Sequence, residues 1–151
     1  VGVPDQILLK PGKLTTSEFE EINKHTVYGR DAIMISERKL GKDSFLRYAK
    51  EIAYTHHEKW DGTGYPKGLS GEDIPVSGRL MAVADVYDAL VSKRVYKPPF
   101  PHSRAKQIIL DGKGLHFDPD MADAFEILAG KFKQIAIEFA DYEEERQMLI
   151  R

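Results

Sequence analysis

Hydrophobic residues recur every three or four positions along most of the chain, and this spacing predicts helices. Thr15 and Glu18 have the spacing of a capping box, which predicts a helix that begins at Thr15 and continues to Gly41. Asp43 or Ser44 can cap a second helix. The pattern shows neither strand-like alternation nor an internal repeat, so we expect an all-α fold.

Glycine and proline separate the remaining segments. Residues 1–14 and residues 58–75 are rich in both, so we expect irregular structure there. Three further helices are predicted, at residues 76–91, at residues 102–111 and from Asp118 onward. The proline that follows Asp118 is typical of a first helical turn. The charged tail, residues 141–151, either continues the last helix or frays, and its acidic run is interpreted as a solvated surface.

Composition narrows the class of protein. The 151 residues contain no cysteine, which excludes disulfides and thiolate chemistry and fits a reducing cytoplasm. A formal net charge of −2 gives no general attraction for polyanions, so we expect no DNA partner. The apolar stretches are too short to cross a bilayer, so we also expect no membrane association.

Two adjacent histidines, His56 and His57, precede the glycine-rich loop. Neighbouring residues lie about 100° apart around a helix, so the pair is not expected to face one metal ion, although it could bind two neighbouring ions. Asp85 and Asp88 share a helix face among small apolar residues, where a buried carboxylate needs a cation or a donor. His25 lies near an apolar stripe. A lone interior histidine is more often a hydrogen-bonded core residue, so the residues alone leave both a metal centre and core contacts open.

Two segments are similar to a known family. They read "HHEKWDGTGYPKGLSGEDIP" at residues 56–75 and "RLMAVADVYDALVSKRVYK" at residues 79–97. Both resemble the HD-GYP family, bacterial phosphodiesterases of cyclic di-GMP that form a branch of the HD phosphohydrolases. The tripeptide for which the family is partly named is here Gly64, Tyr65 and Pro66. The sequence from Ser44 onward is similar to HD-GYP output domains of two-component response regulators. This similarity implies a receiver domain as a partner in the same protein.

The resemblance implies a helical bundle of the HD type at residues 1–140, followed by the charged tail at residues 141–151. It also implies a set of metal ligands, His25, His56, His57 and Asp85. Arg94 and Lys97 match family positions that hold the substrate phosphates, and Asp88 is interpreted as a residue that orients a metal ligand. The cofactors implied are divalent iron or manganese ions in a site of two or three metals.

The family's His-Asp motif does not occur in this chain, because none of its five histidines is followed by aspartate. The segment that starts at Val1 resembles the part of the family just after that motif and its catalytic lysine. We therefore expect an N-terminally truncated domain, in which no residue is assigned with certainty to catalysis and which hydrolyses little substrate alone.

Three functions stay open. The four metal ligands that the family places after its His-Asp motif are all present here, and the Gly-Tyr-Pro tripeptide is intact. Both features favour a cyclic di-GMP phosphodiesterase. The first alternative is a degenerate module that docks diguanylate cyclase domains through its glycine-rich loop. The second alternative is an HD phosphohydrolase for another nucleotide. The product, a linear dinucleotide or two mononucleotides, is not indicated by the sequence.

Overall fold

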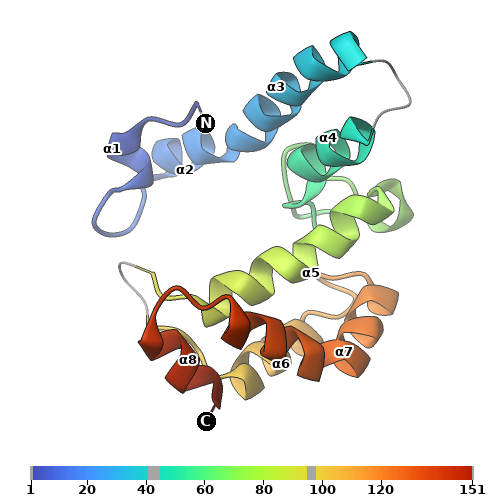
Figure 1. The fold of residues 1–151 in the computed structure, drawn as a ribbon. Coiled ribbons are helices and arrows are strands. Elements are labelled where there is room, and N and C mark those ends of the chain that lie inside the picture. The colour runs from blue at the N-terminus through green and yellow to red at the C-terminus, as the bar shows by residue number, and fades with distance from the viewer. Residues whose placement is uncertain (1, 41–44, 95–97, 151) are drawn as a thin grey trace. The chain divides into compact units, whose positions relative to one another are not determined.

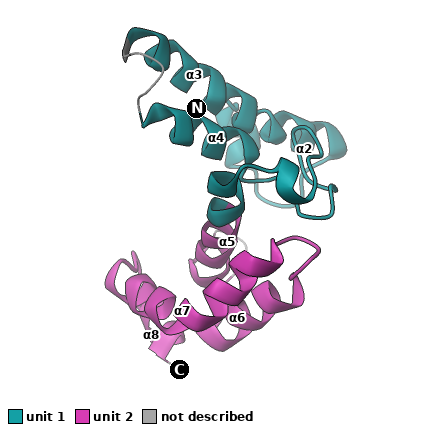
Figure 2. Cartoon of the chain, turned by 90° about the vertical axis from the view of Figure 1, so that its right-hand side faces the viewer, with its two compact units in different colours: residues 1–81 teal, residues 82–151 magenta. Residues whose placement is uncertain are grey.

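The computed structural model describes residues 2–40, 45–94 and 98–150, and the regular elements in these ranges are helices, with no strand (Figure 1). The all-α prediction is therefore confirmed. The chain divides into two compact units, residues 1–81 and residues 82–151 (Figure 2). None of the helices in the described ranges combines the length and apolar composition that a membrane span requires.

The first unit is built around a helical hairpin formed by α3 and α4 (Figure 1). Its elements are α1 (Asp5–Leu8), α2 (Thr16–Asn23), α3 (His25–Leu40), α4 (Leu46–Thr55), the 3-10 helix η1 (Gly71–Asp73) and the first residues of α5 (Val76–Val91). The short helix α1 lies in a segment that was expected to be irregular. That expectation is wrong because Pro4, whose ring restricts φ, precedes the helix and its carbonyl accepts hydrogen bonds from the backbone N–H groups of Ile7 and Leu8.

The predicted capping box is present at the start of α2. The backbone N–H of Thr15 donates to Glu18 Oε2 at 2.7 Å, and the N–H of Glu18 donates to Thr15 Oγ1 at 3.3 Å. Lys10 Nζ also pairs with the Glu18 carboxylate at 2.6 Å. This ion pair and the Thr15 N–H lower the pKa of Glu18 to about 2.

A single helix from Thr15 to Gly41 is the wrong prediction, because the helix is interrupted at Lys24. Just after the interruption, His25 Nδ1 donates to the carbonyl of Ile22 at 2.6 Å and Thr26 Oγ1 donates to that of Asn23 at 2.8 Å. Side chains therefore bind two carbonyls that a continuous helix would pair with backbone N–H groups. The predicted caps of the second helix, Asp43 and Ser44, lie outside the described residues.

The second unit holds the main apolar core. Its helices are the rest of α5, α6 (His102–Asp111), α7 (Pro119–Glu138) and α8 (Glu143–Ile150). The buried core cluster consists of Val83, Tyr87, Val91, Ala105, Ile109, Phe117, Ala122, Phe125, Ala129 and Leu149. The helix predictions at residues 102–111 and from Asp118 are confirmed, and the Asp118 carboxylate accepts the N–H of Asp120 at 2.8 Å.

Within the charged tail, α8 (Glu143–Ile150) is a separate helix that packs on this core through Leu149. Within α8, Leu149 is 1% exposed and Glu145 is 4% exposed. The solvated interpretation of the acidic run is therefore wrong for Glu145. Both oxygens of this carboxylate bond backbone N–H groups, namely those of Lys93 at 2.5 Å, Asp141 at 3.0 Å and Tyr142 at 3.2 Å.

Candidate metal centre

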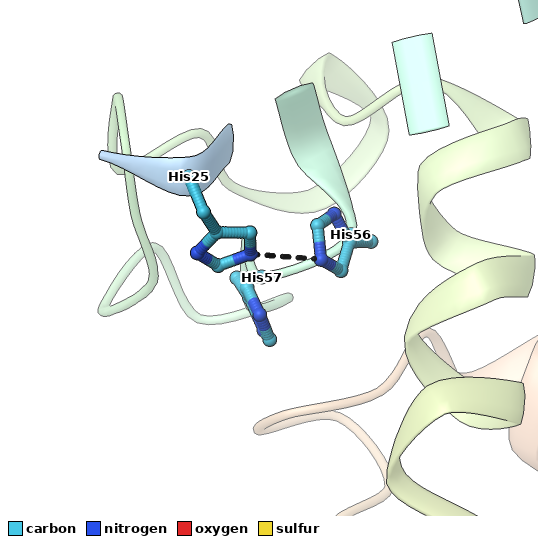
Figure 3. Close-up of side chains that lie close together, drawn as sticks. All are labelled: His25, His56 and His57. Carbon is cyan, nitrogen blue, oxygen red and sulfur yellow. Dashed lines mark hydrogen bonds between the residues drawn. The ribbon is translucent and has the colours of Figure 1, made fainter. Parts of the chain in front are cut away.

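The side chains of His25, His56 and His57 meet in the first unit (Figure 3). One ring nitrogen from each residue lies within 4.8 Å of the other two. The ring centroids of His25 and His57 are 5.0 Å apart, and those of His56 and His57 are 4.1 Å apart. Three imidazoles, each half-buried, therefore converge from the start of α3 and from the end of α4.

The two adjacent histidines lie at a helix end. α4 ends at Thr55, so His56 is its C-cap and His57 already lies in the following turn. The 100° separation of neighbours applies only within a helix. The expectation that His56 and His57 could not face one ion is not supported by this geometry, because both rings belong to a group of three whose ring nitrogens lie within 4.8 Å of one another.

Backbone carbonyls select the tautomer of two of the rings. His25 Nδ1 lies 2.6 Å from the carbonyl oxygen of Ile22, and His56 Nδ1 lies 2.9 Å from that of Ile52. A carbonyl oxygen can only accept, so each Nδ1 carries the hydrogen and each neutral ring presents an unprotonated Nε2. These two Nε2 atoms lie 3.4 Å apart, along the dashed line in Figure 3.

Two facing lone pairs at this distance repel each other unless a proton or a cation lies between them. Imidazole nitrogens that bind one tetrahedral ion at ~2.0–2.1 Å are about 3.4 Å apart, which matches the His25 to His56 separation. Neutral imidazole is also the commonest protein ligand of transition metals, and an Nδ1–H donated to a carbonyl is the usual way to orient it. The three histidines therefore fit a divalent metal ion.

The glycine-rich loop after His57 folds back on this cluster. The N–H of Tyr65 donates to the His57 carbonyl at 3.1 Å, and the Tyr65 ring lies 4.9 Å from the His57 ring. A Cβ on Gly64 would lie 2.4–2.6 Å from backbone atoms of His57, Glu58 and Lys59, so only glycine allows this approach. The bond between Tyr65 and Pro66 is cis.

The other predicted site residues belong to the second unit. Asp85 is half-buried and Asp88 is exposed on α5, where Asp88 accepts a hydrogen bond from Ser92 Oγ at 3.4 Å. Arg94 is exposed just after α5, and Lys97 lies outside the described residues. Because the histidines lie in the first unit, the roles predicted for these four residues stay predictions.

The imidazole cluster at a helix end, before a loop packed on it, defines a helical domain whose histidines could hold a metal ion. A family model described as an HD domain matches residues 1–121. The chain belongs to this metal-dependent HD-domain family and, within it, to the HD-GYP type. The resemblance inferred from residues 56–75 and residues 79–97 is thereby confirmed.

Curated relatives match most of this chain. A Vibrio cholerae serotype O1 protein named cyclic di-GMP phosphodiesterase is 61% identical over 141 residues, which are 93% of this chain and 29% of that protein. A second protein of that organism, named 3'3'-cGAMP-specific phosphodiesterase 2, is 48% identical over 123 residues, 82% of this chain and 23% of that protein. The chain thus spans less than a third of the length of these relatives.

A solved structure supports the fold. The crystal structure of a cyclic GMP-AMP-specific phosphodiesterase of V. cholerae aligns with a TM-score of 0.53 at 19% identity, over 95% of this chain and 35% of that one. At this identity the likeness concerns the HD fold alone.

Proposed function

We propose that this chain is part of a metal-dependent phosphodiesterase that hydrolyses cyclic di-GMP. The observation that carries the proposal is the pair of facing Nε2 atoms of His25 and His56, with His57 beside them. Support for the substrate comes from the relative at 61% identity, which is named for cyclic di-GMP.

The metal site would be held by His25, His56 and His57, with Asp85 as an oxygen ligand. Mixed imidazole and carboxylate ligands suit iron or manganese, and we propose two or three ions in the whole protein. When bound, such ions supply the Lewis acid that activates water and neutralises charge on the phosphodiester. Asp88, one helical turn from Asp85, would orient a ligand through a hydrogen bond.

The remaining residues would bind and enclose the substrate. Arg94 and Lys97 follow α5 and would hold the phosphates, arginine through two parallel hydrogen bonds and lysine as a point charge. The loop with Gly64, Tyr65 and Pro66 would form one wall beside the histidines. It would limit the entry of water and fix the His57 backbone through the Tyr65 N–H.

A second candidate substrate is 3'3'-cyclic GMP-AMP. The relative at 48% identity is named for that nucleotide, and the two substrates differ in one purine base. Both contain the phosphodiester that the proposed centre would attack, so base contacts would have to separate them. This candidate is the specific form of the earlier alternative of an HD phosphohydrolase for another nucleotide.

The proposal also covers the cellular location and the protein partners of the whole protein. We propose a cytoplasmic signalling enzyme with a receiver domain in the same protein. We also propose the glycine-rich loop, residues 58–75, as a docking surface for diguanylate cyclase domains. Docking alone, without hydrolysis, is the outcome expected if the protein is a degenerate member of the family.

The test is hydrolysis by the whole protein, reconstituted with iron or manganese, of cyclic di-GMP and of 3'3'-cyclic GMP-AMP in parallel. We expect faster turnover of cyclic di-GMP and its loss in His57→Ala. His116→Ala is the matched control, because His116 belongs to the second unit, stacks on Phe117 and is not a member of the histidine cluster. Preference for cyclic GMP-AMP would select the second candidate, and no turnover of either would leave only the docking function.

A further inference from the structure

Glu58 is a buried acid immediately after the two histidines. It is 2% exposed, and burial of a carboxylate is costly unless hydrogen bonds compensate its charge. Here Oε1 accepts the backbone N–H of Lys67 at 2.8 Å, and Oε2 accepts that of Leu69 at 3.0 Å. Both carboxylate oxygens are therefore used to hold the far side of the glycine-rich loop.

The same loop is held to the preceding residue as well. The carbonyl of His57 accepts the N–H of Tyr65, and the Tyr65 ring lies against the His57 ring. The loop is thus attached to two successive residues, through a carbonyl at His57 and through a carboxylate at Glu58. Any movement of residues 65–69 would be transmitted to the backbone that carries the His57 imidazole.

We propose that Glu58 is a positioning residue that fixes His57 for metal binding by tethering Lys67 and Leu69. The proposal rests on the proposed function only in requiring that the histidine cluster binds a metal ion. Glu58 is not itself a ligand in this arrangement, because each of its oxygens already accepts a hydrogen bond from the loop backbone and it is absent from the convergent histidine group. Its effect on the metal would be indirect, through the orientation of His57.

The rival explanation is that Glu58 only stabilises the loop. The two explanations differ in what happens to metal affinity when the tether is broken in a folded chain. Residues that orient a metal ligand typically change affinity by about ten- to a hundredfold. A purely structural tether would change the protection of the loop amides and leave metal affinity unchanged.

The experiment compares the whole protein with its Glu58→Gln variant, using Co²⁺ as the probe. Glutamine has the same shape, but its Nε2 is a donor and would face a backbone N–H, so one of the two loop bonds is lost. Two measurements are made on each chain, the Co²⁺ dissociation constant from visible absorption and the hydrogen exchange of the Lys67 and Leu69 amides. Circular dichroism checks that helix content is retained.

We expect Glu58→Gln to weaken Co²⁺ binding by about tenfold and to speed exchange of at least one of the two amides. The matched control is Glu72→Gln, which removes the same charge from an exposed position in the same segment and should change neither quantity. If Glu58→Gln does not fold, Glu58→Asp keeps the charge with a side chain one methylene shorter. It should show the same pattern more weakly.

Two results would overturn the proposal and can be told apart. If the unsubstituted whole protein binds Co²⁺ and Glu58→Gln binds it equally well while the loop amides exchange faster, Glu58 is structural only. If the unsubstituted whole protein does not bind Co²⁺, the histidine cluster is not a metal site, and the proposed function loses its support together with this inference.

Discussion

The ring of Tyr65 lies 4.9 Å from the ring of His57, with 33° between their planes. The Tyr65 ring also lies 6.3 Å from that of Phe19 on α2, so it joins the loop to both the histidine cluster and a neighbouring helix. An aromatic residue in a glycine-rich loop commonly anchors the loop, and this contact fits that interpretation. The loop conformation and the site geometry are therefore coupled.

Gly64 makes this close approach possible, so Gly64→Ala should destabilise the chain. The added Cβ would lie 2.4–2.6 Å from three backbone atoms, which cannot move independently, and we expect a loss of about 1–3 kcal/mol in the free energy of unfolding. The control is Gly130→Ala in α7, where a Cβ meets nothing within 4 Å and should stabilise by about 0.5–1 kcal/mol. Urea denaturation measures both, and equal effects would contradict the packing argument.

Glu145 should matter more for stability than its charged neighbour Glu144. Glu145→Ala removes the acceptor of three backbone N–H groups at a buried position, and we expect a loss of about 2–4 kcal/mol. Glu144→Ala removes only a half-exposed ion pair with Lys93 and should cost less than about 1 kcal/mol. Thermal and urea unfolding of the two variants would disprove this ranking if they were equally stable.

His102 should make stability fall under mildly acidic conditions. Its burial, and then the nearby Lys133 and Lys106, lower the pKa of His102 below the ordinary 6.5. Its Nδ1 lies 2.9 Å from the hydroxyl of Tyr87, whose own pKa is raised to about 12 by burial, so tyrosine donates and neutral histidine accepts.

The direction of the pH dependence of stability follows from the lowered pKa of His102. Between that lowered pKa and about pH 6.5, the histidine binds a proton in the unfolded chain but not in the folded chain. This contribution to stability is therefore present above about pH 6.5 and is lost as the pH falls through the lowered pKa. Unfolding measured from about pH 5 to pH 8 should show a weaker pH dependence in His102→Gln. An NMR titration that places the pKa of His102 at or above 6.5 would contradict the prediction.

Asp85 and Asp88 should differ in their effect on metal content. If Asp85 is an oxygen ligand, Asp85→Asn should lower the number of ions bound by the whole protein. Asp88→Asn should keep that number and weaken binding by about tenfold, because it acts through another residue. Metal analysis after dialysis gives both quantities, and an unchanged metal content in Asp85→Asn would remove it from the ligand set.

Lys97 should act on substrate binding, and His57 on the chemical step. The Lys97 ammonium would bind the substrate phosphate equally well in the ground state and in the transition state. Lys97→Ala should therefore raise KM, by about tenfold or more if a contact of ~1.5–3 kcal/mol is lost. His57→Ala should reduce kcat through loss of metal. Steady-state kinetics of the whole protein separates the two, and a Lys97→Ala variant with unchanged KM and no turnover would reverse the assigned roles.

The sequence by itself determined the helical class, the capping box at Thr15 and Glu18, the start of α7 at Pro119 and the family. These features depend on residues that are close along the chain, where spacing alone fixes which groups meet. The sequence also indicated His56 and His57 as candidate metal ligands, because they lie at the end of an apolar stripe and before a glycine-rich loop.

Only the tertiary structure decided how these residues meet. His56 and His57 follow the end of α4 at Thr55 and meet His25 from the start of α3. The carbonyls of Ile22 and Ile52 set which nitrogens face each other. Glu58 was missed, although an acid directly after the histidines and before a glycine-rich loop was a signal that could have identified it. The N–H groups that Glu58 binds lie 9 and 11 residues along the chain, and one that Glu145 binds lies 52 residues away. Contacts at such separations leave no periodic trace in a sequence.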